Sequence, residues 1–216
     1  MQLFHYHWWT NKVEEMEKFY VNLGFQVMLR VGKYEGEMQT FNSPLKWDDF
    51  RHKEITFRII EMRKGQTNVT FGYGKKDRFD HIGFLVNNNE YKQIINRAEE
   101  LNWKVNEGER RTFIATPWKI RIELQKRADV ITEVKDTMIK TMEIYLPFND
   151  NPKLISYLLG LKVTLESNTE IKMQGKSWSM AFLNESHTKM SKITFLSKEF
   201  FDKVDPVNTR LLSVNN

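Results

Sequence analysis

The strongest constraint on the fold is a segment pattern that restarts along the chain. An alternating, strand-like stretch at 3–9 precedes a helix-like stripe at 13–23, and strand-like stretches follow at 25–31, 55–62 and 68–73. Strands alternate their side chains with period two, whereas helices repeat apolar positions every three to four residues. A β-α-β-β-β unit is therefore predicted over residues 1–75.

A second unit follows with the same order of segments. A strand is expected at 79–86 and a helix at 91–101, followed by short strands at 103–105, 112–115 and 119–125. The three asparagines at 87–89 can cap the helix. In the first unit, Asn11 with Glu14 three residues later resembles a capping box. The segment 32–53, with its proline and mixed charge, is expected to be an irregular excursion.

A third unit begins after the charged link at 126–136. Its expected elements are a strand at 139–146, a helix near 152–159 that ends at Gly160, and strands at 162–165, 171–174 and 178–183. A fourth unit starts at 192–196, continues at 199–204 and breaks off at Asp205 and Pro206, with no last strand expected after it. The chain is thus predicted to hold about three and a half repeat units.

Composition narrows the partners and the chemistry. With 216 residues, 40% of them hydrophobic, the chain can fill a core, and the lack of cysteine leaves only nitrogen and oxygen ligands for a metal. The net charge of +5 comes from basic and acidic residues mixed along the chain, which predicts a solvated surface and no nucleic-acid partner. No run approaches the length of a membrane helix, and the first residues do not resemble a leader, so a cytoplasmic protein without a membrane partner is expected.

Three residues in strand-like segments form a candidate metal site: His5, His81 and Glu123. Two imidazoles and one carboxylate leave open coordination positions, which is typical of a reactive metal. In the strand at 119–125, the aliphatic residues alternate with Arg121, Glu123 and Gln125, so the carboxylate is expected on the face opposite the helices. His81 has the same parity in its own strand.

Motifs in the first two units carry a family resemblance. They are His5, the pair Phe19-Tyr20, the run Leu23-Gly24-Phe25, the run Asp80-His81-Ile82-Gly83-Phe84, and Pro117 followed by Ile122-Glu123-Leu124. Together they resemble the vicinal oxygen chelate superfamily, the group of glyoxalases, extradiol dioxygenases, fosfomycin-resistance proteins and bleomycin-resistance proteins. The likeness covers residues 1–126 and continues through 205 only as architecture.

The resemblance implies an α+β fold in which tandem β-α-β-β-β modules form a cup-shaped sheet, followed here by a degenerate second pair. The expected division is a metal-site domain at 1–126, with modules at 1–75 and 78–126, degenerate modules at 137–205, and a tail at 206–216. The family's ligand positions match His5, His81 and Glu123. Its metal would be Fe2+ or Mn2+, with Zn2+ also compatible with this ligand set.

Further site residues follow from the same reasoning. The fourth ligand of the glyoxalases matches Thr70, a poor ligand, and Glu61 lies one strand too early, so the resemblance is closer to the three-ligand dioxygenases and fosfomycin-resistance transferases. His7 shares the face of His5 and is a candidate catalytic or supporting residue. Trp9, Arg58, Thr70 and Arg121 are candidate substrate-pocket residues. His52 and His187 are expected to be solvated.

The third and fourth units lack the ligands. Alignment of the repeats puts Met142, or its neighbours Thr141 and Glu143, at the place of the first histidine, and Lys192 at the place of the second. The leading functional hypothesis is a metal-dependent dioxygenase-like or glyoxalase-like enzyme acting on a small oxygen-rich molecule. The alternative is a metal-free protein that binds or sequesters a small molecule, as bleomycin-resistance proteins do. Either a monomer or a homodimer is compatible with the sequence.

Overall fold

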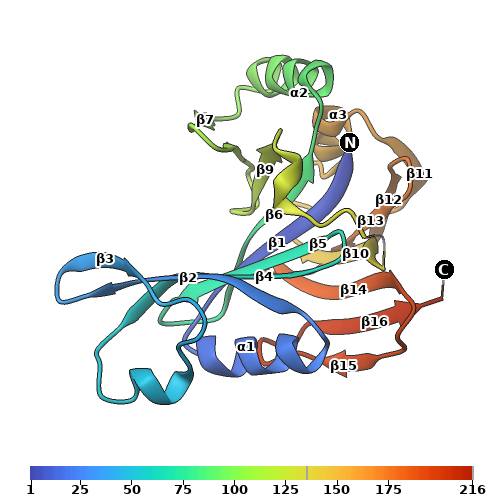
Figure 1. The fold of residues 1–216 in the computed structure, drawn as a ribbon. Coiled ribbons are helices and arrows are strands. Elements are labelled where there is room, and N and C mark those ends of the chain that lie inside the picture. The colour runs from blue at the N-terminus through green and yellow to red at the C-terminus, as the bar shows by residue number, and fades with distance from the viewer. Residues whose placement is uncertain (135, 216) are drawn as a thin grey trace.

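The computed structural model describes residues 1–134 and 136–215. The first module contains β1 (Gln2–Thr10), α1 (Val13–Asn22), β2 (Gln26–Tyr34), β3 (Glu37–Thr40), the short 3-10 helix η1 (Trp47–Phe50), β4 (Thr56–Lys64) and β5 (Thr67–Tyr73). The second contains β6 (Arg78–Leu85), α2 (Asn88–Glu100), β7 (Val105–Glu107), β8 (Thr112–Ala115) and β9 (Arg121–Gln125). Their strands join into one nine-stranded sheet in the order β3-β2-β4-β5-β1-β6-β9-β8-β7 (Figure 1).

The rest of the chain repeats this plan. After the 3-10 helix η2 (Ala128–Val130), the third module contains β10 (Thr137–Leu146), α3 (Lys153–Leu159), β11 (Lys162–Glu166), β12 (Glu170–Gln174) and β13 (Ser179–Asn184). The partial fourth module contains β14 (Lys189–Ser197), β15 (Asp202–Val204) and β16 (Arg210–Val214). These strands form a seven-stranded sheet in the order β11-β12-β13-β10-β14-β16-β15. The predicted α+β fold of tandem modules is confirmed.

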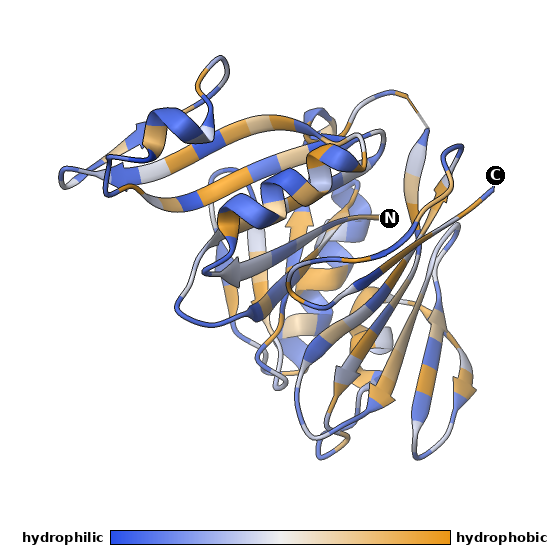
Figure 2. Cartoon of the chain, turned by 90° about the horizontal axis from the view of Figure 1, so that it is seen from below, coloured by the Kyte–Doolittle hydropathy of each residue, from blue (hydrophilic) through white to orange (hydrophobic). Residues whose placement is uncertain are grey.

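Apolar and polar residues alternate along the strands and fix which face is buried (Figure 2). In β1, Tyr6 and Trp8 are almost fully buried in the core, where the Tyr6 hydroxyl donates to that of Tyr20 in α1. His5 and His7 lie on the opposite face, beside Asn68 and Thr70 of β5. A one-residue slip of β1 would put the histidines into the core and the aromatic rings onto the concave face, so burial specifies the register.

The two sheets share one hydrophobic core. The ring of Phe84 in β6 packs against Trp178 with centroids 5.3 Å apart, and the backbone of Gln66 donates to the carbonyl of Thr137 at 2.8 Å. Lys12, just before α1, donates to the carbonyl of Pro206 at 2.8 Å, close to the C-terminal strands. Among the described residues, no helix is long and apolar enough to cross a membrane.

The two predicted helix caps have opposite outcomes. Asn87 caps α2, because its side chain accepts from the backbone N–H of Glu90 and the Glu90 carboxylate accepts from the backbone of Asn87, as predicted. The capping box expected at Asn11 is wrong. Helix α1 begins after Lys12 without a side-chain cap, and the carboxylate of Glu14 binds Lys18 and Arg51 instead.

The segment 32–53 is more ordered than predicted. Strand β2 continues to Tyr34 and pairs with β3 in a hairpin, and η1 follows. Arg30 explains this order: its guanidinium is buried, forms a two-pronged ion pair with Glu17 at 2.7 Å and donates to the carbonyls of Phe41 and Leu45. A buried charge must be paired and fully hydrogen-bonded, so it fixes the loop that supplies those carbonyls.

The prediction that no last strand follows the fourth module is also wrong. The expected tail at 206–216 contains β16, which pairs in parallel with β14 as β9 pairs with β6. Leu211 and Ser213 are buried, and Ser213 donates to and accepts from the backbone of Phe201. The buried positions of this five-residue strand are one apolar residue and one serine, so it lacks the apolar alternation that marks a strand in a sequence.

Candidate metal centre

Three central strands bring the candidate ligands together. β1, β6 and β9 are adjacent in the sheet, and Gly83 of β6 is paired with both His5 of β1 and Glu123 of β9. A Cβ at Gly83 would lie 2.8 Å from the Cβ of His5, so only glycine leaves space for this ring. The site is thus built across strands that are far apart in sequence.

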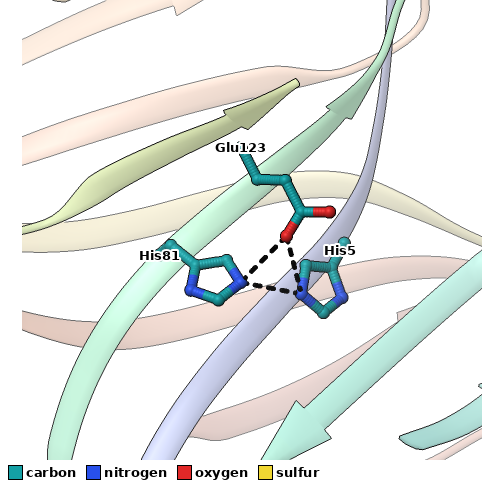
Figure 3. Close-up of side chains that lie close together, drawn as sticks. All are labelled: His5, His81 and Glu123. Atoms are coloured by element: carbon teal, nitrogen blue, oxygen red, sulfur yellow. Dashed lines mark hydrogen bonds and ion pairs between the residues drawn. The ribbon is translucent and has the colours of Figure 1, made fainter. Parts of the chain in front are cut away.

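The side chains of His5, His81 and Glu123 converge on one point (Figure 3). The two Nε2 atoms are 3.0 Å apart, and Oε2 of Glu123 lies 3.1 Å from Nε2 of His81 and 3.8 Å from Nε2 of His5. All three residues are at most 3% exposed. Within residues 1–134 and 136–215, this is the one cluster of three or more histidine or carboxylate side chains with metal-binding spacing.

Neighbouring groups orient both rings. Nδ1 of His5 donates to the Asn68 side chain at 2.9 Å, and Nδ1 of His81 donates to Asp80 at 2.8 Å. Because each ring places its proton on Nδ1, both Nε2 lone pairs point into the site. A metal-bound imidazole uses this arrangement, with its second nitrogen held by a carboxylate or carbonyl.

The donor set fits a divalent cation. Oε2 of Glu123 is buried and has no hydrogen-bond partner, and it faces two nitrogen lone pairs. These electron-rich atoms repel one another unless a cation lies between them. Adjacent ligands about 2.1 Å from a metal at right angles are separated by about 3.0 Å, which agrees with the shorter distances at this site.

The protonation states of His5 and Glu123 also favour the binding of a metal. Burial lowers the pKa of His5 to about 4, so its Nε2 is unprotonated near neutral pH. Burial alone would raise the pKa of Glu123, but the adjacent His81, His5 and Arg111 outweigh this effect and hold it at about 2. Metal ligands must be deprotonated, and both groups meet that condition without a metal.

His7 and Thr70 lie beside the three ligands. The His7 ring stacks on His81 with centroids 4.8 Å apart, and its Nδ1 is 2.6 Å from the Thr70 hydroxyl. Its Nε2 is buried without a hydrogen-bond partner, and burial lowers the pKa of His7 well below its ordinary value. His7 is therefore a neutral imidazole with one nitrogen free for a proton or a ligand. Thr70 holds the His7 ring through this contact.

The other predicted pocket residues are dispersed. The rings of Trp9 and His7 meet edge to face with centroids 4.7 Å apart, but Trp9 and Arg58 together line a separate open recess near Tyr73. Arg121 binds Asp80 and lies over the ring of Phe113, 4.3 Å from its centroid, so it supports the carboxylate that orients His81. His52 and His187 are exposed, as expected.

A cavity of about 380 Å³ opens onto His5, Glu123 and Thr70. Its lining includes Glu61, which the sequence analysis considered only as a fourth ligand. It also includes residues that sequence reasoning missed: Arg63 from β4, Asn68 from β5, Arg110 and Arg111 from the turn between β7 and β8, and Arg127. The sequence could have indicated Asn68 as a site residue, because it has the same strand parity as Thr70. The sequence could also have indicated Asp80, since it directly precedes His81. Nothing in the sequence indicated Arg110, Arg111 and Arg127, since they lie outside the strands and such positions carry no face parity.

No family model and no curated protein sequence matches the chain. Several solved structures, however, match its fold. An extradiol ring-cleaving dioxygenase from B. fuscum aligns with a TM-score of 0.67 and 13% identity over 100% of this chain and 72% of that one. The 2,3-dioxygenase LapB from a Pseudomonas species aligns with a TM-score of 0.66 and 13% identity over 100% and 92%. The 4-hydroxymandelate synthase from Streptomyces coelicolor aligns with a TM-score of 0.65 and 9% identity over 92% and 72%.

These alignments confirm the resemblance at the level of fold. The identities are low, and the likeness extends over both sheets, because the dioxygenase alignments cover the whole chain. Both sheets of this chain therefore have counterparts in the ring-cleaving enzymes. The chain shares its fold with these extradiol dioxygenases.

Proposed function

We propose that this protein is a divalent-metal-dependent enzyme that acts on a small oxygen-rich molecule, with a dioxygenase-like reaction. The observation that carries the proposal is the convergence of His5, His81 and Glu123, with two lone pairs 3.0 Å apart and an unpartnered carboxylate oxygen. The adjoining cavity supports it, because its volume is that of a small-molecule site.

His5, His81 and Glu123 would hold Fe2+ or Mn2+, and the same ligands would accept Zn2+. When bound, such a metal supplies Lewis-acid polarisation of substrate oxygens. Asn68 and Asp80 keep both imidazoles in the metal-binding tautomer. His7 adds a neutral ring nitrogen that can accept a proton from a substrate hydroxyl, with Thr70 fixing its orientation.

The three-ligand set favours the dioxygenase-like reaction over the glyoxalase-like one. A fourth carboxylate ligand would have to replace Thr70, whose hydroxyl is engaged with His7 at 2.6 Å. Glu61 is nearby in β4, but its carboxylate binds Arg63 and the Asn68 side chain. A metal with three protein ligands keeps more open coordination positions than a metal with four. These positions can take substrate oxygens and a second molecule.

The first test is the metal content of the purified protein by mass spectrometry. We expect about one Fe, Mn or Zn per chain, lost in His81→Ala and Glu123→Ala because each removes a ligand. His52→Ala and His187→Ala are matched controls, since both histidines are exposed, and they should keep the metal. Undiminished metal in either ligand variant would remove the assignment.

The second test separates the enzyme from a metal-free binding protein. The metal-loaded protein is incubated with a panel of catechols while oxygen uptake and product absorbance are followed. Uptake that needs the metal supports a dioxygenase. Thermal stabilisation by an aromatic compound that is insensitive to a chelator, without turnover, would favour the sequestering protein.

A further inference from the structure

The cavity beside the candidate metal site is lined by more positively than negatively charged side chains. Six of its lining side chains are charged: Glu61, Arg63, Arg110, Arg111, Glu123 and Arg127. Positive charge therefore exceeds negative charge around a partly enclosed site, where charge interactions are stronger than at an open surface. The question is which of these cations are free to meet a ligand.

Two of the arginines are already neutralised by neighbours. Arg63 donates to Glu61 at 2.6 Å, and Glu61 also accepts from Asn68 at 2.8 Å. Arg127 donates through Nε to Asp129 at 3.0 Å. These pairs belong to the cavity wall and leave little unbalanced charge.

The other two arginines come from the turn between β7 and β8. Arg110 is exposed and makes no ion pair with any residue of the described chain. Arg111 lies over Phe113 and has Glu123 as its nearest carboxylate, at 3.6 Å. That contact is longer than a good charge-assisted hydrogen bond, and the same oxygen points at the metal ligands. The carboxylate cannot fully serve both cations.

A bound metal would increase the imbalance. Two neutral imidazoles and one carboxylate leave a divalent ion with one uncompensated positive charge. The cavity lining also contains apolar side chains, those of Phe4, Met28, Leu29, Ile59 and Val130. A ligand that satisfies this cavity therefore needs an apolar body and negative charge.

We propose that the Arg110–Arg111 turn selects substrates that carry an anionic oxyacid group, a carboxylate or a phosphonate, on an aromatic or alkyl body. This proposal rests on the proposed function for the placement of the substrate's chelating oxygens. Arg110 acts as the specificity residue, since a guanidinium matches the geometry of a carboxylate with two parallel hydrogen bonds. Arg111 adds charge at the metal side of the cavity.

The test compares two catechols that differ in charge. Binding of 3,4-dihydroxybenzoate and of 4-methylcatechol to the metal-loaded protein is measured by anaerobic titration calorimetry, with metal content determined in the same samples. We expect the carboxylate to bind about ten times more tightly at low salt, because one charge-assisted hydrogen bond is worth about that factor. The preference should shrink at high salt.

Arg110→Gln should remove most of the preference without changing metal content, since Arg110 forms no ion pair with a candidate ligand, and Arg111 supplies only the remainder. Arg210→Gln, an exposed arginine of the second sheet, is the control and should leave the preference intact. Equal binding of both probes, binding of neither, or an unchanged preference in Arg110→Gln would overturn the proposal. A protein that retains no metal would refute the proposed function instead, and the metal measurement distinguishes the two failures.

Discussion

The two sheets are built on one plan, and within the described residues only the first carries the candidate metal ligands. Pairing of β10 with β14 and of β14 with β16 repeats the pairing of β1 with β6 and of β6 with β9. Register by register, Thr141 takes the place of His5, Lys192 that of His81, and Leu212 that of Glu123. Of the neighbours proposed for the first histidine's place, the register selects Thr141.

The two sheets also differ in how deeply the side chains at these equivalent positions are buried. In the second sheet, Glu143 takes the place of His7 and forms an ion pair with Lys192 at 2.6 Å, with both side chains more than a quarter exposed. In the first sheet, the ligands are nearly inaccessible, because long β2, the β7–β8 turn and the segment around Val130 cover them. The fold alone therefore does not make a metal site. Ligand identity and a covering wall must be added to it.

The largest expected effect is an exchange of residues between equivalent positions. His81→Lys gives the first sheet the residue of the second, and we expect complete loss of metal because a ligand is replaced by a cation. Lys192→His is the reciprocal control and should leave the metal content at about one per chain. Mass spectrometry of both variants checks this. Retained metal in His81→Lys would show that the residue at this position does not account for the difference between the two sheets.

The next effect concerns the junction between the sheets. Asp205 is 3% exposed, accepts from the backbone of Val207 and Thr209, and has one oxygen without a partner. Burial raises its pKa from 3.8 to about 7, so the folded state keeps a proton that the unfolded chain releases. Stability from this group is present below about pH 4 and is lost as the pH rises through about 7.

Asp205→Asn should therefore stabilise the protein at alkaline pH. The difference from wild type should approach about 4 kcal/mol above pH 7 and be smaller at pH 5. Urea unfolding in chelator at both pH values measures it, with the exposed Asp202→Asn as control. A stability gain that is the same at both pH values would show that charge burial is not the cause.

A smaller effect is expected from the residue that orients His81. Asp80→Asn removes the carboxylate that accepts from Nδ1 of His81, and the equivalent position in the second sheet is Ser191. We expect metal affinity to fall by about ten- to a hundredfold, as for other groups that orient metal ligands. Competition with a fluorescent chelator gives this value. An unchanged affinity would mean that the ring is oriented by packing alone.

The smallest effect is predicted for the pair that replaces the site in the second sheet. Glu143→Gln should change the free energy of unfolding by at most about 0.5 kcal/mol, because half-exposed ion pairs contribute little. Urea unfolding of the metal-loaded protein measures this change, and metal content should not change. A loss of several kcal/mol would show that the second face is as tightly organised as the first.

Local sequence patterns were sufficient for most elements. Period-two alternation located β1, β6 and β9, and the asparagines at 87–89 located the start of α2. Patterns failed where long-range contacts decide, as in the loop organised by buried Arg30 and in the short last strand β16. The Asn11 cap failed because Glu14 binds Arg51, which lies 37 residues away.

The sequence by itself determined the module repeat and the faces of the strands, because side-chain parity is a local property of an extended chain. It thereby placed His5, His81 and Glu123 on one surface. Only the tertiary structure decided that their nitrogen and oxygen atoms lie within 3.8 Å, since this depends on the non-sequential order of β1, β6 and β9. It also decided that the arginines of the β7–β8 turn reach the cavity, because a loop position depends on the contacts of the whole fold.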